Sequence, residues 1–294
     1  MVAINGMSKH PERFASGRIS AVFVQHRNRN MVEAAFSTLL LMYFQTIHVL
    51  RSEHRNPLIG LLLAIVQSSL MVAVFFALYY VIGVRTSPIR GDFMIFIMSG
   101  IFVFVTHVQA TGAVSGSGAL TSGMTKHGPM NSAILIAGAA IAVLYRQVLS
   151  CVVILGAYHA FITPVIINDW VSCMGLLLLA WLSGCCVGLV FLSMRPWAPK
   201  ASGLLTTVYS RLNMIASGKM FVANTLPNFM LPYFAWNPLF HIIDQMRGYA
   251  FINYVPHKTN LAYPIYFTIT VAMIGLMAEF VTRNRVSASW TAGR

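Results

Sequence analysis

Hydrophobic residues along this chain gather in long runs, separated by short segments that carry most of the charged residues. A helix that crosses the roughly 30 Å hydrocarbon layer of a bilayer needs about 20 apolar residues. Six runs reach that length, and they predict an all-α polytopic membrane protein with six transmembrane helices inside residues 57–284. The predicted spans are Pro57–Val84, Phe93–Ala113, a part of Ser132–Ile162, Trp170–Met194, about Leu204–Phe221 and Leu261–Val281.

A further apolar stretch, Met31–Leu50, contains several polar residues and has basic residues on both sides, with Arg29 before it and Arg51 after it. If it crossed the membrane, one basic cluster would be translocated. We therefore predict an amphipathic helix over residues 31–56 that lies at the cytoplasmic interface. It would follow a basic cytoplasmic tail over residues 1–30. A transmembrane helix at Met31–Leu50 remains the alternative.

Lysine and arginine beside the predicted spans indicate the orientation, because cytoplasmic loops carry an excess of both. They concentrate in the segments that lie on the same side as the N-terminus. With six spans, the C-terminus returns to that side. We therefore expect both termini in the cytoplasm, with residues 285–294 as a short C-terminal tail.

Composition agrees with a chain covered by lipid. Charged residues make up 9% and hydrophobic residues 57%, and the mean hydropathy is +0.70. Soluble domains carry about 25% charged residues, so the composition excludes a soluble enzyme, a secreted disulfide scaffold and a disordered protein. The net charge of +13 comes from basic residues beside the spans. We therefore expect no nucleic-acid partner.

The sequence lacks the motifs of several kinds of enzyme. The sequence contains no GxxxxGK[ST], HExxH or GxSxG, and Glu279 is the only acid inside a predicted span. ATP hydrolysis by a P-loop, zinc proteolysis and a proton relay are therefore not expected of this chain. We predict no catalytic residue, no metal site and no cofactor on it.

Two connecting segments are unusual. Ala119–Asn131 is a short cytoplasmic turn with Lys126, His127, Gly128 and Pro129 at its tip. The segment of about 222–260 is long, half apolar and broken by prolines, and it contains a helix-like run at Pro238–Gly248. Irregular backbone at membrane depth is tolerated only where it packs on protein or lines a cavity. We therefore predict a re-entrant element on the outer side, before the last span.

Arg211 lies within the predicted fifth span, with Tyr209 beside it and Lys219 eight residues later. That spacing brings the two cations close to one helical face, where they would suit an anionic substrate. Alternatively, Arg211 reaches the inner headgroups and only fixes the topology. The aromatic residues Phe221, Tyr233, Phe234 and Trp236 lie near the outer ends of spans. They fit an interfacial belt or the lining of a sugar path.

Two patterns indicate helix packing. His107 lies in the predicted second span, and we interpret it as a hydrogen-bonding residue between helices. Gly184 and Gly188 form a GxxxG motif, which lets two helix backbones approach closely. The partner helix could belong to the same chain or to a second copy.

The chain resembles the permease subunits of type-2 ABC exporters, and among them the capsular-polysaccharide and O-antigen group. The resemblance rests on the layout and on the stretch Asn237–Gly248, followed by Tyr263-Pro264 before the last span. This stretch is similar to the family's Asn-Pro-apolar segment with an acid and then an Arg three positions later, here Asp244 and Arg247. The sequence departs from the family in having Asp rather than Glu at 244 and few basic residues at Thr125–Pro129.

The resemblance implies a homodimer that binds two copies of a separate ATP-binding subunit, which holds ATP and magnesium. The interface helix and the loop containing Lys126, His127, Gly128 and Pro129 would couple to that subunit. Asn237, Pro238, Asp244 and Arg247 would belong to a gate helix on the outer side. Tyr209, Arg211, Lys219, Phe221, Tyr233, Phe234 and Trp236 are candidates for the substrate path.

The expected function is export of a lipid-linked polysaccharide across the inner (plasma) membrane of a bacterium, with periplasmic export proteins as further partners. The alternatives are the same machine with another substrate, such as a teichoic acid, a lipid or a drug, and a polytopic membrane enzyme.

Overall fold

The computed structural model describes residues 31–53, 57–83, 89–117 and 132–291, with the backbone alone at residues 53, 57, 58 and 283–291. The predicted tail 1–30 and the predicted coupling residues 126–129 lie outside the described residues. The chain divides into two compact units, residues 1–37 and residues 38–294. In the first unit the described residues are the beginning of helix α1, and all relationships given below belong to the second unit.

The described residues form helices and no strand. The helices are α1 (Met31–Glu53), α2 (Pro57–Ile82), α3 (Phe93–Ser117), α5 (Ser132–Phe161), α6 (Trp170–Met194), α7 (Pro199–Ala216), α8 (Leu231–Ala235), α9 (Pro238–Ala250) and α10 (Ala262–Thr291), with a short 3₁₀ turn η1 (Ala223–Thr225). The predicted all-α class and the helix-like run at Pro238–Gly248 are confirmed.

Six of the described helices are long and apolar enough to cross a membrane, which agrees with the predicted number. The set differs from the prediction, however, because Met31–Ser52 belongs to it and α7 does not. Helix α7 begins at Pro199 and ends at Ala216, whereas the predicted fifth span was about Leu204–Phe221. Its 18 residues include Thr, Ser, Arg and Asn, so its hydropathy is low. The predicted bounds of this span are therefore wrong.

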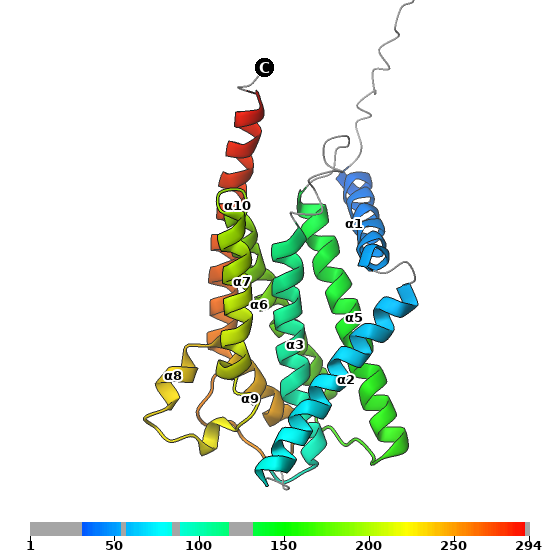
Figure 1. The fold of residues 1–294 in the computed structure, drawn as a ribbon, viewed down its shortest axis with the longest axis vertical. Helices are drawn as coiled ribbons and strands as arrows, with labels where there is room; N and C mark the ends of the chain where they lie inside the picture. Colours follow the sequence, from blue (N-terminus) through cyan, green and yellow to red (C-terminus); the bar gives the residue numbers. More distant parts are fainter. Residues whose placement is uncertain (1–30, 54–56, 84–88, 118–131, 292–294) are drawn as a thin grey trace, which may run out of the picture. The chain divides into compact units, whose positions relative to one another are not determined.

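Helix α3 lies in the middle of the second unit, with α6 and α7 on one side and α5 and α2 on the other (Figure 1). Most of its residues are buried, which explains why it is apolar around its whole circumference. A Cβ atom added to Gly184 would lie 2.4 Å from the backbone oxygen of His107, and one at Gly188 2.7 Å from that of Thr111. The GxxxG motif therefore packs α6 on α3 of the same chain.

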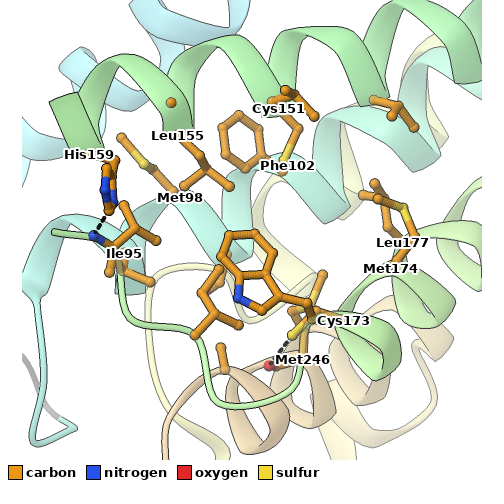
Figure 2. A pocket seen from close by; sticks show the side chains of 18 residues that line it. Ile95, Met98, Phe102, Cys151, Leu155, His159, Cys173, Met174, Leu177 and Met246 are labelled. Atoms are coloured by element: carbon orange, nitrogen blue, oxygen red, sulfur yellow. Dashed lines mark hydrogen bonds between the residues drawn. The ribbon is translucent and has the colours of Figure 1, made fainter.

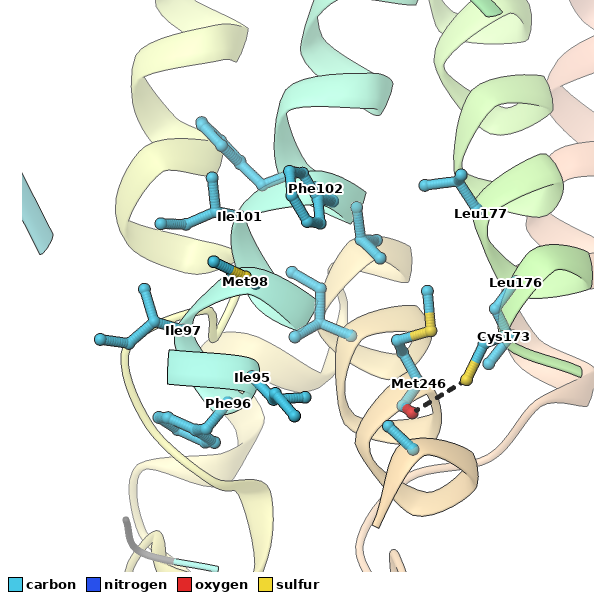
Figure 3. Close-up of a cluster of buried hydrophobic side chains, with 14 of the residues drawn as sticks. Ile95, Phe96, Ile97, Met98, Ile101, Phe102, Cys173, Leu176, Leu177 and Met246 are labelled. Atoms are coloured by element: carbon cyan, nitrogen blue, oxygen red, sulfur yellow. Dashed lines mark hydrogen bonds between the residues drawn. The ribbon is translucent and has the colours of Figure 1, made fainter. Parts of the chain in front are cut away.

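A cluster of buried apolar side chains joins α3, α6 and α9 (Figure 3). Phe96, Ile97 and Ile101 of α3 are at most 2% exposed, and α9 adds Met246 to the same cluster. Helix α9 thus packs across the beginning of α3 and of α6. This packing fixes the position of the motif residues that α9 carries.

Helix α1 buries a partly polar face. Gln45, Thr46 and Val49 are buried, and a Cβ atom at Gly138 of α5 would lie 2.5 Å from Cγ of Gln45. The large apolar residue Tyr43 lies on the exposed side, together with Leu39. Such a face suits contact with lipid both at an interface and across a bilayer. The interface position of α1 therefore stays a prediction.

Candidate functional site

Arg247 of α9 binds the turn that follows α7. Its guanidinium donates from Nη1 to the backbone oxygens of Gly218 (3.2 Å) and Phe221 (2.6 Å), and from Nη2 to that of Lys219 (2.7 Å). Its Cζ atom lies 4.1 Å from the ring centre of Phe96. The side chain is 1% exposed. A buried cation is tolerated only when acceptors surround it, and here three carbonyl groups and an aromatic face do so.

The turn has this shape because of Gly218. Helix α7 ends at Ala216, and Gly218 has a φ of +71°, which L side chains rarely adopt. A Cβ atom at this position would also lie 2.5 Å from Cδ2 of Phe240. Glycine therefore permits both the reversal of the chain and the close approach of α9. Arg247 binds three of the carbonyl groups that this turn presents, those of Gly218, Lys219 and Phe221.

Asp244 binds backbone and hydroxyl groups on both sides of α9. Its Oδ1 accepts from the backbone N–H of Ala223 (3.3 Å) and the hydroxyl of Tyr254 (2.6 Å), and its Oδ2 accepts from Oγ1 of Thr259 (2.8 Å). Burial and the hydrogen bond to Asp244 raise the pKa of the Tyr254 phenol, so this group keeps its proton and donates. Asp244 thus joins the turn before α8 to the segment after α9.

Asp244 and Arg247 form neither an exposed ion pair nor a solvated helix face. Both residues are 1% exposed. The spacing of three residues places them on one side of α9, but each side chain binds a different part of the segment around it. The motif stabilises the packed segment rather than a solvent-facing surface.

Asn237 begins α9 and ties it to α7. Its Oδ1 accepts from the backbone N–H of Leu239 (3.0 Å), as an N-cap residue does. Its Nδ2 donates to Oδ1 of Asn213 (2.9 Å) and to the backbone oxygen of Ala216 (3.0 Å). Pro238 occupies the first helical position, where its missing N–H costs nothing. The Asn-Pro pair therefore starts α9 and satisfies a carbonyl at the end of α7.

The two cations predicted on one face of the fifth span lie apart. Lys219 is 3% exposed, donates to the backbone oxygen of Met214 (2.7 Å) and lies 3.5 Å from the ring centre of Phe104. Arg211 is exposed on α7. Because the helix ends at Ala216, helical phase no longer relates the two residues. The predicted shared cationic face is therefore wrong.

Tyr209 points into the helix bundle. Its hydroxyl lies 2.9 Å from Nε2 of His107, whose Nδ1 lies 2.9 Å from Oγ of Ser183 and 3.1 Å from the backbone oxygen of Ala180. His107 is completely buried. This network joins α7, α3 and α6, so the interpretation of His107 as a hydrogen-bonding residue between helices is confirmed.

The candidate aromatic residues divide into two groups. Phe221 and Phe234 pack on each other and on Phe240, with ring centres 4.9 to 6.3 Å apart. Tyr233 is 72% exposed and Trp236 is 55% exposed, and the indole N–H of Trp236 donates to the backbone oxygen of Tyr233 (2.6 Å). The first group builds the segment, whereas the second is free to contact another molecule.

Three glutamine side chains form a hydrogen-bonded chain that was not predicted from the sequence. Gln147 of α5 donates to Oε1 of Gln109 of α3 (2.7 Å), and Gln109 donates to Oε1 of Gln67 of α2 (3.3 Å). Gln147 is buried and Gln67 is exposed. Polar residues that bond across helices stabilise membrane bundles. Their isolated positions in three separate apolar runs gave no signal that they meet.

Comparisons with known proteins found two relatives. The chain is 25% identical to the polysialic acid transport protein KpsM of Escherichia coli over 236 residues, which are 77% of this chain and 86% of the relative. It is 30% identical to a second protein of the same name and organism over 112 residues, which are 37% of this chain and 43% of the relative. No protein-family model matches the chain. The chain is therefore homologous to KpsM, and the resemblance to the permease subunits of type-2 ABC exporters is confirmed.

Proposed function

We propose that this chain is the membrane-spanning permease subunit of an ATP-driven exporter that moves a lipid-linked polysaccharide of the capsular or O-antigen type. The observation that carries the proposal is the homology to KpsM over 77% of the chain. The buried motif of α9 supports it, because Asn237, Asp244 and Arg247 are the residues on which the resemblance rests. The chain lies in the bacterial inner membrane with both termini in the cytoplasm.

ATP hydrolysis is assigned to a separate subunit. The absence of a P-loop from the sequence supports this division of work. Two copies of the ATP-binding subunit, which hold ATP and magnesium, bind a homodimer of this chain at α1 and at the segment with Lys126, His127, Gly128 and Pro129. Periplasmic export proteins receive the polymer.

The substrate path runs along the exposed face of α7 and past the segment before α9. Arg211 supports this path, because a cation exposed to hydrocarbon costs about 2.5–3.5 kcal/mol on insertion scales unless polar groups surround it. A hydrated path with an anionic polymer would supply such groups. Tyr233 and Trp236 offer exposed aromatic faces to sugar rings at the end of the path. The wall of the path is held in place by side chains that pack or bond inside the protein, namely Lys219, Tyr209, Phe221 and Phe234.

The segment of residues 222–260 acts as the exit gate. Its helix α9 is bound to the end of α7 by Asn237 and to the turn after α7 by Arg247. A movement of α7 would therefore move α9. We assign to this attachment the coupling of ATP binding to the opening of the path.

The test of the proposed function is reconstitution of export. Cells that make the lipid-linked polymer but lack their own permease receive this chain with its ATP-binding subunit, and polymer on the cell surface is measured. We expect surface polymer with the unaltered chain and none when a Gly/Ser linker replaces Lys126–Pro129. The linker variant should still reach the membrane.

The same cells separate the substrate classes. The double variant Tyr233→Ala/Trp236→Ala should lose most surface polymer at unchanged chain abundance, and Tyr80→Ala, another exposed aromatic change, serves as the matched control. Accumulation of a teichoic acid, a lipid or a drug outside the cell, with no surface polysaccharide, would replace the polysaccharide by that substrate. Export by the chain in the absence of any ATP-binding subunit would refute the proposed function.

A further inference from the structure

An apolar cavity of about 430 Å³ lies between α3, α5, α6 and α9. Figure 2 shows Phe102 and Met98 of α3, Cys151 and Leu155 of α5, and Leu177 of α6 around it. Met246 of α9 closes one side. The cavity is distinct from the face of α7 that carries Arg211. None of the residues of the proposed substrate path lines it.

Three polar atoms of the lining, on Ser99, Cys173 and His159, already take part in hydrogen bonds. Ser99 Oγ donates to the backbone oxygen of Phe96 (2.8 Å), and the Cys173 thiol donates to that of Met246 (3.9 Å). Nδ1 of His159 accepts from the backbone N–H of Val165 (2.9 Å). A cavity that offers no further hydrogen bonds in its interior does not hold water well. Its occupant is therefore expected to be apolar.

The cavity opens between α5 and α6. The lining residues that are exposed come from these two helices, and they include Val152 (57%), Trp170 (54%) and Met174 (41%). Gly156 of α5 also lines the cavity, and a Cβ atom there would meet nothing within 4 Å. Since α5 and α6 are both long and apolar enough to cross a membrane, an opening between them would be accessible to lipid.

Two side-chain N–H groups lie on residues at the opening of the cavity. Because Nδ1 of His159 accepts a hydrogen bond, the neutral ring carries its proton on Nε2. His159 lies near the end of α5 and Trp170 at the beginning of α6, and both line the cavity. Within the described part of the chain, neither this Nε2–H nor the indole N–H of Trp170 has a hydrogen-bond partner. Tryptophan at a helix end commonly places its N–H at the headgroup level of a bilayer.

We propose that this cavity binds one acyl chain of a phospholipid-type molecule, whose headgroup oxygens accept hydrogen bonds from His159 and Trp170. The volume of about 430 Å³ is far larger than a single water needs, which suits an elongated apolar group such as a membrane acyl chain. The donor of the chain is either a bilayer phospholipid or the lipid anchor of the exported polymer. Only the second source rests on the proposed function.

A substitution of Gly156 tests whether obstruction of the cavity prevents lipid binding. Gly156 lines the cavity, and a Cβ atom there would meet nothing within 4 Å, so Gly156→Phe adds a large side chain at the mouth of the cavity. Gly175 of α6 is the matched control, because its Cβ would also meet nothing within 4 Å and it does not line the cavity. Met174→Trp is a second obstructing variant, in case Gly156→Phe does not reach the membrane.

The experiment uses the full chain with its ATP-binding subunit in vesicles of phosphatidylethanolamine and phosphatidylglycerol, with a trace of phospholipid that carries a photoreactive group on one acyl chain. Crosslinked peptides are identified by mass spectrometry. We expect strong labelling of the α5 and α6 peptides that line the cavity, relative to exposed α10 peptides. Gly156→Phe should reduce that ratio by about tenfold, equivalent to about 1.4 kcal/mol, whereas Gly175→Phe should leave it unchanged.

Equal labelling of α10 and of the cavity peptides, or an unchanged ratio in both obstructing variants, would overturn the proposal. The double variant His159→Phe/Trp170→Phe tests the headgroup contacts and should weaken the labelling without abolishing it. Addition of unlabelled lipid-linked polymer then identifies the source. Competition indicates the anchor of the polymer, whereas its absence, with cavity labelling retained, indicates a bilayer phospholipid. Because the vesicle assay requires no transport, a failure of the proposed export function would not affect it.

Discussion

The side-chain amide of Asn237 donates to the side-chain oxygen of Asn213 across 2.9 Å, and both residues are almost completely buried. Asn213 in turn donates to the backbone oxygen of Tyr209 (3.0 Å). Two residues that are 24 positions apart thereby join the first turn of α9 to the last turn of α7. This bond and those of Arg247 make the junction of the two helices one hydrogen-bonded unit.

Replacement of Asn237 by alanine should destabilise the chain by about 2 kcal/mol or more. The loss of an N-cap costs about 1 kcal/mol, and the oxygen of Asn213 would be left buried without a donor, at a further cost of about 1–3 kcal/mol. Thermal unfolding of the purified chain in detergent measures the effect. Asn228→Ala, at an exposed asparagine, is the control. Equal melting temperatures of the two variants would contradict the role of Asn237 as a tie.

Arg247→Lys should fail to replace arginine. The guanidinium reaches three carbonyl oxygens of the turn at once, whereas an ammonium group is a single point charge on a different stem. Removal of a partner from a buried charged network typically costs about 3–5 kcal/mol. We expect the variant to lose most of its abundance in the membrane, as measured by immunoblotting. Arg90→Lys, at an exposed arginine, should retain it. Normal abundance of Arg247→Lys would show that charge alone suffices.

Two glycine-to-alanine variants, one inside α7 and one just after it, should shift the melting temperature in opposite directions. Gly218→Ala must adopt a φ of +71° and places Cβ 2.5 Å from Phe240, so it should lower the melting temperature clearly. Gly203→Ala lies inside α7, where Cβ would meet nothing within 4 Å, and it should stabilise the helix by about 0.5–1 kcal/mol. A shift of the same sign in both variants would argue against the turn geometry.

A second glycine pair tests the packing of α6 on α3. Gly184→Leu would drive a side chain into the backbone oxygen of His107, which a Cβ atom alone approaches to 2.4 Å. Gly175→Leu lies on the same helix and faces open space. Protease resistance of the chain in native membranes should fall in the first variant and stay unchanged in the second. Comparable resistance of both variants would mean that the two helices tolerate separation.

Arg211→Gln should reduce surface polymer strongly without changing the melting temperature, because Arg211 is exposed and its removal breaks no packing. Arg211→Lys should retain part of the export, since it keeps the charge. Lys200→Gln, which removes an exposed cation at the beginning of the same helix, is the matched control. Full export by Arg211→Gln would exclude this residue from the substrate path and favour a role in topology.

The apolar runs made most helices predictable, because length and hydropathy alone identify a segment that can cross a bilayer. Helix α7 shows where this reasoning ends. Its threonine, serine and asparagine side chains bind the helix itself or neighbouring helices, as Ser202 does through the backbone oxygen of Phe191 (2.6 Å). A hydropathy average cannot represent such bonds. The end of α7 depends on Gly218 and on the approach of Phe240, which lies 22 residues further along the chain.

The roles of the motif residues could be predicted only in part. The Asn-Pro pair is a helix start by its chemistry, and α9 does begin there. The partners of Asp244 and Arg247 could not be predicted, because they are backbone and hydroxyl groups from distant turns. Acid and base three residues apart suggest an exposed pair when only the helix is considered. Residues 217–225 fold around α9, and both side chains are therefore buried and bound to this segment.

The attachment of Arg247 to the carbonyl groups of Gly218, Lys219 and Phe221 also limits how the end of α7 can change shape. If the chain around Gly218 unwound, these oxygens would lose their donor in a place that water does not reach. A small rotation of α7 about its axis can therefore move this end and α9 together. A bend at the turn is disfavoured. An inhibitor that separated the two helices would have to break the hydrogen bonds of Arg247 and Asn237 in a buried place.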